Sequence, residues 1–257
     1  MKTYTDLSAW RDERRRQARA GITLGVVPTM GALHDGHLSL VRRSRAENDR
    51  TLVTIFVNPT QFDDPTDLAA YPRTLDDDVA LLQAEGADFV LAPGAADLYP
   101  DGYRYRVTEI ERSRELEGAF RPGHFDAVLT VVLKLLHIAG ADRAYFGEKD
   151  WQQLTLVQGM AHAFFLPTAI IACPTVREAS GLAMSSRNRR LSEEDRRKAP
   201  DLHRVLSAAS TAGEAERDLV ADGFSVDYVE DREARRLAAV RLGDVRLIDN
   251  VPLGDRG

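Results

Sequence analysis

Residues 22–57 read ITLGVVPTMGALHDGHLSLVRRSRAENDRTLVTIFV, and this stretch predicts the class of fold. A β-branched run over residues 22–27 predicts a strand, residues 37–47 predict an amphipathic helix, and residues 51–57 predict a second strand. The second strand is apolar along nearly its whole length, as is typical of a parallel strand covered on both faces. Strand, helix and strand in this order indicate a parallel βαβ unit.

The same alternation continues to residue 173. Further helices are expected at residues 75–85, 127–139 and 151–164, and further strands at 89–92, 144–146 and 169–173. The helix at 127–139 is apolar nearly all round, which predicts a buried helix. The pattern predicts an α/β protein with a doubly wound parallel sheet, in which ligands bind at the carboxyl ends of the strands.

After Pro174 the regular alternation of strand and helix patterns ends, and we expect a second, smaller α+β domain. Residues 192–206 are charged and predict a helix, and residues 226–229 and 240–248 predict short strands. The expected domains are residues 1–174 and 175–257. Residues 254–257 are expected to fray.

Composition excludes several classes of protein. The 257 residues carry 34 Lys and Arg against 40 Asp and Glu, a net charge of -6, which argues against a nucleic-acid-binding protein. A single cysteine, Cys173, excludes an internal disulfide and fits a reducing compartment. The charged N-terminal residues lack a secretory h-region, and no apolar run has the length of a membrane helix. We therefore expect a soluble cytoplasmic enzyme or a ligand-binding module.

The densest candidate site is PTMGALHDGH at residues 28–37, between the first predicted strand and the helix. Its glycines allow the backbone to approach a ligand closely, and the helix start offers N–H groups to an anion. The imidazoles of His34 and His37, three residues apart, can stabilise charge on a transferring phosphate. A metal pair, or two surface histidines without a role, remain as alternatives.

Four further clusters lie near predicted strand ends or at the domain junction. Asn58 and Gln61 suit a small substrate with hydroxyls or a carboxylate, or belong to an ordinary capped turn. Lys149 begins a helix, where it either reaches a triphosphate as a point charge or is simply solvated. Residues 181–188 resemble either a mobile phosphate clamp or a plain loop, and Arg121 and His124 either bind an anion or pin a loop.

Taken together, these strings resemble the pantothenate synthetase family, the pantoate–β-alanine ligases. The resemblance covers most of the chain and rests on PTMGALHDGH (28–37), FVNPTQF (56–62), YPR (71–73), RPGHF (121–125), FGEKD (146–150), PTVRE (174–178), GLAMSSRN (181–188) and RLIDN (246–250). It implies a Rossmann-like domain of the nucleotidyltransferase superfamily with a small C-terminal lid domain, a homodimer, and the use of ATP with Mg²⁺. The implied reaction condenses (R)-pantoate with β-alanine through a pantoyl adenylate, releasing AMP and pyrophosphate.

The resemblance also implies roles for individual residues. His37, His34 and Lys149 would act on the phosphates as catalytic groups. Gln61 and Gln153 would bind pantoate, and Gln61 would also lie near β-alanine. Asn58, Tyr71, Arg121 and His124 would be secondary contributors. The implied ATP site comprises Met30, Gly31, Ala32, Leu33, His34, Asp35, Gly36, His37, Gly147, Glu148, Lys149, Asp150, Val176, Met184, Ser185, Ser186 and Arg187.

The metal ligands stay unknown at this level. The acidic run Asp76, Asp77 and Asp78 is interpreted either as a Mg²⁺ holder or as a solvated helix start. Asp126 and Ala127 depart from the usual residues after RPGHF, which puts the contacts of Arg121 and His124 in question.

Two other functions remain open, a nucleotidyltransferase for a phosphorylated acceptor and a nucleotide-binding module without turnover. The neutral side chains of Gln61 and Gln153 favour a hydroxy acid over a phosphate.

Overall fold

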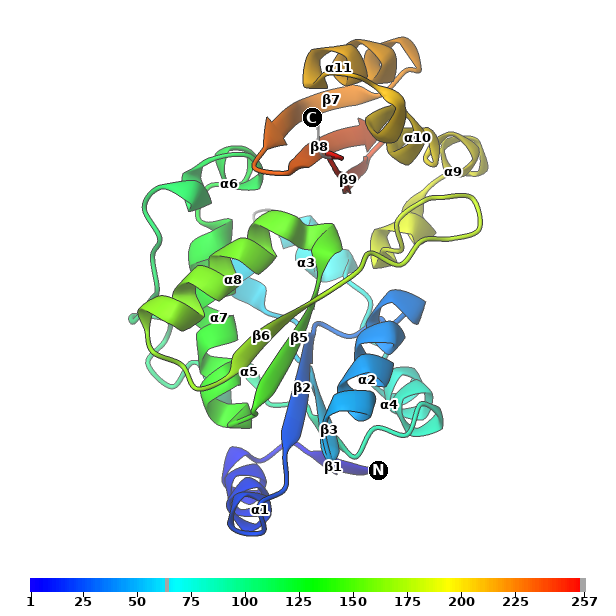
Figure 1. Ribbon diagram of the computed structural model, residues 1–257. Coiled ribbons are helices and arrows are strands. Elements are labelled where there is room, and N and C mark those ends of the chain that lie inside the picture. Colours follow the sequence, from blue (N-terminus) through cyan, green and yellow to red (C-terminus); the bar gives the residue numbers. More distant parts are fainter. Residues whose placement is uncertain (63–64, 255–257) are drawn as a thin grey trace. The chain divides into compact units, whose positions relative to one another are not determined.

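The computed structural model describes residues 1–62 and 65–254, and within them six parallel strands form one sheet in the order β1-β4-β3-β2-β5-β6 (Figure 1). The predicted parallel α/β sheet is therefore confirmed. Its strands are β1 (Lys2–Tyr4), β2 (Leu24–Thr29), β3 (Arg50–Ile55), β4 (Phe89–Leu91), β5 (Arg143–Gly147) and β6 (Ala169–Cys173). The pattern did not predict β1.

Helices cover both faces of this sheet (Figure 1). Helices α2 (Asp35–Glu47) and α7 (His124–Ala139) both pack on β2, from opposite sides. Successive strand residues point to opposite faces, so Val27 and Val53 join the core beneath α2 and α4 (Leu75–Ala84). The other helices of this part are α1 (Leu7–Arg19), α3 (Pro65–Ala70), α5 (Ala95–Leu98), α6 (Glu117–Phe120) and α8 (Trp151–Ala163), with 3-10 turns at Pro59–Gln61, Arg112–Arg114 and Glu148–Asp150.

The order of the strands decides where a ligand can bind. Strand β2 pairs with β3 on one side and with β5 on the other, so successive connections leave β2 in opposite directions. A switch of this kind opens a crevice outside the carboxyl ends of the strands. Thr29 and Ile55 are register partners at the ends of β2 and β3, so the loops that follow these two strands begin side by side.

The chain divides into two compact units. The first comprises Met1–Gly147 and Gln152–Cys173, and the second comprises Glu148–Trp151 together with the residues from Pro174 onward. The turn Glu148–Trp151 thus belongs to the second unit although the sheet of the first unit flanks it in the sequence. No helix in the portion described combines the length and apolarity needed to span a membrane.

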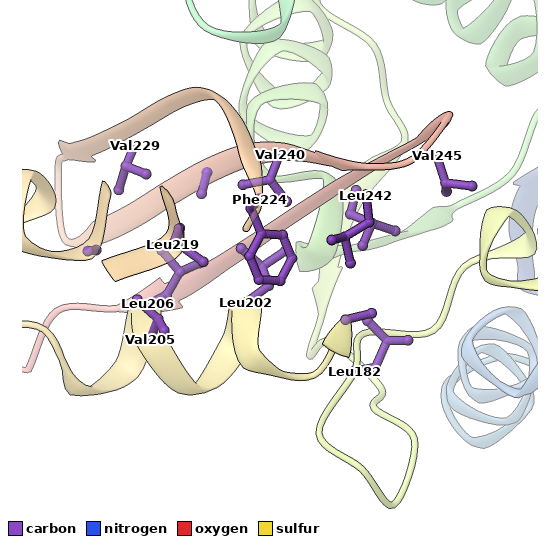
Figure 2. Close-up of a cluster of buried hydrophobic side chains, with 14 of the residues drawn as sticks. Leu182, Leu202, Val205, Leu206, Leu219, Phe224, Val229, Val240, Leu242 and Val245 are labelled. Carbon is purple, nitrogen blue, oxygen red and sulfur yellow. The ribbon is translucent and has the colours of Figure 1, made fainter. Parts of the chain in front are cut away.

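The second unit contains an antiparallel sheet of β7 (Ser225–Arg232), β8 (Arg235–Leu242) and β9 (Val245–Pro252). Helices α9 (Glu193–Lys198), α10 (Asp201–Ala208) and α11 (Ala212–Ala221) accompany it, with a 3-10 turn at Ser186–Arg190. Leu202 and Leu206 of α10, Leu219 of α11, and Phe224 pack with Val240 of β8 in a buried apolar cluster (Figure 2).

Two predictions for this unit need correction. The single strand expected at 240–248 is wrong, because Gly243 and Asp244 form a two-residue turn between β8 and β9. Gly243 has a φ of 52°, which glycine adopts readily and which suits a hairpin of this kind. The helix expected at 192–206 is two helices, since Pro200 has no N–H to continue the ladder of α9. Residues 255–257 of the expected frayed end lie outside the described residues.

Candidate active site

The loop between β2 and α2 carries both histidines and has an unusual backbone. Gly31 and Ala32 have φ values of 80° and 51°, in the left-handed region that disfavours side chains such as that of Ala32. The loop is anchored at its start, where Gly31 N–H donates to Thr29 Oγ1 at 3.2 Å. Thr29 Oγ1 in turn donates to the Thr54 carbonyl at 2.8 Å. The loop is therefore held at the carboxyl edge of the sheet.

Asp78 holds the middle of this loop from helix α4. Its carboxylate accepts the Ala32 N–H at 3.0 Å and the Leu33 N–H at 2.8 Å, and Thr74 Oγ1 donates to it at 3.1 Å. Asp78 is 2% exposed, whereas Asp76 and Asp77 are exposed. The interpretation of the acidic run as a solvated helix start therefore holds for Asp76 and Asp77 and is wrong for Asp78. The pattern could not separate three adjacent aspartates, because only packing decides which one turns inward.

His34 and His37 lie next to each other at the start of α2, with ring centroids 4.1 Å apart. His34 is the N-cap residue, and its Nδ1 accepts the Gly36 N–H at 3.1 Å. Because Nδ1 accepts, the proton of the neutral ring lies on Nε2, which is a donor. The main-chain N–H groups of Gly36 and His37 belong to the first turn of a 13-residue helix, whose dipole favours an anion. The predicted juxtaposition of the two imidazoles is present.

Gln61 lies beside the same loop, at the end of the turn that follows β3. Its Oε1 accepts from Asn58 Nδ2 at 3.0 Å, and its Nε2 contacts the sulfur of Met30 at 3.1 Å. A thioether is a weak acceptor, so an oxygen of a ligand would be a better partner for Nε2. Asn58 is 1% exposed and also accepts from the Tyr99 hydroxyl at 2.8 Å. Asn58 therefore orients the side-chain amide of Gln61.

Arg121 and His124 hold the main chain of Gln61. Arg121 Nη2 donates to the Gln61 carbonyl at 3.1 Å, and His124 Nδ1 donates to the same oxygen at 3.0 Å. Because a carbonyl only accepts, the His124 proton lies on Nδ1, and Nε2 accepts from Arg121 Nη1 at 3.1 Å. Arg121 and His124 thus both contact the main chain of Gln61 in a chain that carries Asp126 and Ala127 after RPGHF. Of the two roles considered for Arg121 and His124, the contacts show the pinning of a loop.

Helix α8 carries two adjacent glutamines with different surroundings. Gln152 is buried, accepts the Glu117 N–H at 3.0 Å, and donates to the carbonyls of Arg112 and Glu115, both at 2.8 Å. Gln153, the predicted pantoate ligand, is half-buried, and no hydrogen bond to its side chain is found within the described residues. Gln152 therefore supports a loop, and Gln153 keeps its amide for another partner.

Lys149 lies in the turn Glu148–Asp150, which is held by the second unit. Asn250 Nδ2 donates to the carbonyls of Glu148 and Lys149 at 2.9 and 3.0 Å, and Arg235 pairs with the carboxylate of Glu148. The Arg235 guanidinium also lies 4.1 Å from the centre of the Trp151 ring. Lys149 Nζ is 3.6 Å from Asp150 Oδ1, and the Lys149 side chain is 18% exposed. The turn is rigidly supported, so its lysine has a defined position.

Residues 176–184 form a small hairpin within the second unit. Met184 N–H donates to the Val176 carbonyl at 3.0 Å, and Glu178 N–H donates to the Leu182 carbonyl at 2.8 Å. Arg177 makes a bidentate ion pair with Asp249 of β9, at 2.6 and 2.9 Å. Asp249 is 4% exposed, so this charge pair is well shielded from water. The hairpin carries Val176 and Met184, two of the predicted ATP contacts.

The predicted clamp residues Ser185, Ser186 and Arg187 follow this hairpin in a 3-10 turn. Ser185 is its N-cap, and its hydroxyl accepts the Arg187 N–H at 3.2 Å. The buried Asn188 donates to Glu178 Oε1 at 3.1 Å and to the Ala183 carbonyl at 3.0 Å. This segment is therefore hydrogen-bonded into the second unit.

The structure brings several predicted groups together within the first unit. The loop with His34 and His37, the turn with Asn58 and Gln61, and the pair Arg121 and His124 form a connected set through Met30 and the Gln61 carbonyl. Sequence reasoning missed the anchoring role of Asp78 and the support from Gln152 and Asn250. Asn250 had one usable signal, since it stands in the string RLIDN. Within the residues described, no group of three or more His, Cys, Asp or Glu side chains is placed to hold a metal ion.

A doubly wound parallel sheet with a histidine-bearing loop and a helix start at its carboxyl edge defines a Rossmann-like α/β protein with a candidate nucleotide phosphate site. The family model described as pantoate-beta-alanine ligase matches residues 1–252. The chain therefore belongs to the pantoate–β-alanine ligase family.

Relatives and solved structures agree with this family. The chain is 51% identical to the pantothenate synthetase of Bdellovibrio bacteriovorus, over 98% of each chain. It is 53% identical to that of Cereibacter sphaeroides, over 91% of this chain and 93% of the relative. A Francisella tularensis pantoate-beta-alanine ligase, complexed with beta-gamma ATP and beta-alanine, superposes with a TM-score of 0.92 at 39% identity over 98% of both chains. Pantothenate synthetase from Thermus thermophilus gives a TM-score of 0.89 at 41% identity, over 98% of this chain and 99% of that one.

The family predicted from the sequence motifs is thus confirmed, and so is the predicted enzyme class, an ATP-dependent ligase of the pantothenate pathway. The alternative of a binding module without turnover is set aside. The alternative of a transferase that acts on a phosphorylated acceptor is set aside by the same matches.

Proposed function

We propose that this chain condenses (R)-pantoate with β-alanine in two steps that share a pantoyl adenylate. In the first step a pantoate carboxylate oxygen attacks the α-phosphorus of ATP, the bond from that phosphorus to the bridging oxygen breaks, and pyrophosphate leaves with the electron pair. In the second step the β-alanine amine attacks the activated carbonyl carbon. The carbon–oxygen bond to AMP breaks, the amine loses a proton, and pantothenate and AMP result.

The observation that carries this proposal is the imidazole pair beside the Gln61 amide. The rings of His34 and His37 stand 4.1 Å apart at a helix start, where the helix dipole favours phosphate. Gln61 Nε2 adjoins the same loop through Met30. Phosphate-stabilising groups and a neutral amide in one unit suit the joining of a carboxylate to a nucleotide. No enzyme nucleophile is needed, so positioning and charge stabilisation supply the rate.

Each side chain has a role in this proposal. His37 and His34 stabilise the negative charge that grows on the phosphates as pyrophosphate leaves, and Lys149 binds a phosphate as a point charge. Gln61 and Gln153 donate to pantoate oxygens, and Gln61 also borders β-alanine. The remaining ATP contacts are proposed at the positions that match the family motifs: Met30 to Leu33, Asp35, Gly36, Gly147, Glu148, Asp150, Val176, and Met184 to Arg187.

Mg²⁺ is proposed to come with the nucleotide. Mg²⁺ commonly keeps several waters and binds through substrate phosphates with one or two carboxylates. The residues described offer no preformed cluster of three protein ligands, and the oxygens of Asp78 already accept three hydrogen bonds. Charge neutralisation of the phosphates is the chemistry that the ion would supply.

The remaining proposals concern assembly and location. We propose a homodimer, which the resemblance to the pantoate–β-alanine ligase family implies. Residues 175–257 are proposed as a lid domain. Cytoplasmic action is proposed because the one cysteine is a buried thiol and ATP is the energy source.

A labelled substrate tests the adenylate directly. Protein is mixed with ATP, Mg²⁺ and pantoate that carries ¹⁸O in its carboxylate, first without β-alanine. Pyrophosphate should form in a single turnover, and after β-alanine is added AMP should contain one ¹⁸O atom from pantoate. Pyrophosphate that appears only with β-alanine, or AMP without the label, would exclude this route.

A further inference from the structure

Asp78 is a buried carboxylate in an otherwise exposed acidic run. It is 2% exposed, while its neighbours Asp76 and Asp77 are in contact with solvent. A buried carboxylate is costly unless donors satisfy its oxygens. Three donors do so here, namely the N–H groups of Ala32 and Leu33 and the hydroxyl of Thr74. Two of the three come from the histidine-bearing loop.

The backbone of the loop is shaped to make these two bonds. Gly31 and Ala32 both have positive φ, and the consecutive N–H groups of Ala32 and Leu33 then converge on one carboxylate. A concave array of this kind binds an anion. Here the anion is supplied by the chain itself. Ala32 stands in a region that non-glycine residues enter only when their surroundings hold them there.

The contact lies immediately before the two imidazoles. Leu33, whose N–H donates to Asp78, is followed directly by His34, the N-cap of α2, and His37 N–H donates to the His34 carbonyl at 2.8 Å. A shift of the Ala32 and Leu33 peptides therefore moves the cap and the ring of His34 against that of His37. Because catalysis by preorganised donors depends on sub-ångström placement, this shift changes the rate.

We propose that Asp78 is a positioning residue, which holds the loop in its left-handed conformation so that His34 and His37 face the transferring phosphates. This inference rests on the proposed function of the two histidines. It assigns Asp78 to the loop backbone rather than to Mg²⁺, because its two oxygens are already engaged by three donors. Asp78 does not touch the substrate, and its effect passes through the loop.

The test compares Asp78→Asn with Asp77→Asn, an equal change of charge at an exposed neighbour. An amide keeps the shape of Asp78 but presents only one acceptor oxygen, so one of the loop N–H groups meets an NH₂ group. For Asp78→Asn, kcat for pyrophosphate formation should fall about tenfold to a hundredfold. The KM for pantoate should stay within about a factor of three, because Gln61 is untouched. Asp77→Asn should match the wild type.

Two readouts separate positioning from other roles. The imidazole ¹⁵N resonances of His34 and His37 should shift in Asp78→Asn and stay in place in Asp77→Asn, whereas those of the exposed His162 should not change in either variant. The Mg²⁺ concentration for half-maximal rate should be the same in all three proteins. A Mg²⁺ requirement raised tenfold in Asp78→Asn, with activity restored by excess Mg²⁺, would make Asp78 a metal ligand and overturn the proposal.

A double-mutant cycle with His37→Ala distinguishes this inference from the proposed function. If His37→Ala alone leaves pyrophosphate formation unchanged, the role of His37 in the proposed function fails. If His37→Ala slows the reaction and Asp78→Asn in that background has its full effect, only the positioning role fails. Positioning through the imidazoles predicts less than the product of the two effects.

Gly31→Ala offers a second route should Asp78→Asn fold poorly. A Cβ on Gly31 would lie 2.9 Å from Asp78 Oδ2, at a φ of 80°, so it separates the loop from the intact carboxylate. The same fall in kcat and the same shifts of the histidine resonances are expected. Wild-type values for both measurements in folded Gly31→Ala would refute the role of the contact.

Discussion

Asn250 Nδ2 donates to the main-chain carbonyls of Glu148 and Lys149, at 2.9 and 3.0 Å. Asn250 is 2% exposed and belongs to β9, about a hundred residues along the chain from the turn that it supports. A single amide thus fixes the main chain on which Lys149 is mounted. Its Oδ1 accepts from Arg235, which pairs with Glu148, so the turn is held by side chain and main chain together.

Asn250→Asp should therefore weaken ATP binding and lower stability. The variant keeps an acceptor for Arg235 and removes the donor to the two carbonyls, and each buried acceptor left unsatisfied costs about 1–3 kcal/mol. Calorimetric titration with ATP and thermal unfolding measure the two effects. Asn48→Asp makes the same chemical change at an amide of the first unit, and it serves as the matched control in the thermal unfolding experiment. An Asn250→Asp protein with wild-type ATP affinity would mean that the turn needs no such support.

His37→Ala should slow pyrophosphate formation about 10²-fold or more, the range for removing one donor to transition-state charge. A rapid-quench assay with saturating ATP and pantoate measures this step. His162→Ala, a change at an exposed histidine of α8, should behave as the wild type. Near-normal turnover of His37→Ala would show that the imidazole pair does not face the reacting phosphates.

Lys149→Ala should lower the same rate by about 10²-fold, because the charge beside the phosphates is lost. Lys149→Arg keeps the charge but changes its shape and reach, so it should recover part of the rate. Single-turnover kinetics with both variants measure the difference. Equal loss in both variants would indicate that the position of the ammonium, rather than its charge, decides the rate, whereas no loss in either would remove Lys149 from the site.

Gln61→Ala should impair the use of pantoate more than the binding of ATP. Among the residues described, the hydrogen-bond partner of Gln61 Nε2 is the Met30 thioether, so loss of Gln61 removes a donor that pantoate would otherwise receive. The KM values for pantoate and ATP, measured separately, check the prediction. Gln83→Ala, an exposed position on α4, serves as the control. If both KM values rise equally, the substitution acts on the fold of the turn and not on pantoate.

Glu13 should make stability depend on pH in the acid range. A hydrogen bond from Gln17, opposed by burial and assisted by Arg16 and Tyr4, lowers the pKa of Glu13 from 4.5 to about 2. The folded state therefore favours the charged form. Its contribution is complete above pH 4.5 and is lost as the pH falls from 4.5 towards 2. The difference in unfolding free energy between the wild type and Glu13→Gln should shrink over this interval.

Urea unfolding at several pH values measures this difference. Asp12→Asn, at an exposed neighbour in α1, gives the background. A difference between the wild type and Glu13→Gln that stays constant from about pH 6 to about pH 2 would contradict the lowered pKa of Glu13.

Much of the grouping of residues within the site can be predicted from the sequence, because these residues are close neighbours in the chain. His34, Gly36 and His37 sit in one loop at a helix start, and Asn58 and Gln61 in one turn, so their local grouping follows from the sequence. The support of these groups does not follow. Asp78 and Asp77 are chemically identical, and only the packing of α4 against the loop turns one inward and leaves the other in water.

The sequence by itself determined the alternation of buried strands with helices, and hence the parallel sheet, because hydrophobic periodicity is a local property. Its motifs also determined the family. Only the tertiary structure decided that Arg121 and His124 donate hydrogen bonds to the Gln61 carbonyl. It also decided that Asn250 donates hydrogen bonds to the turn before α8, and that residues 240–248 form a hairpin. Such contacts join residues far apart in the chain, and their energy depends on geometry that exists only when the chain has folded.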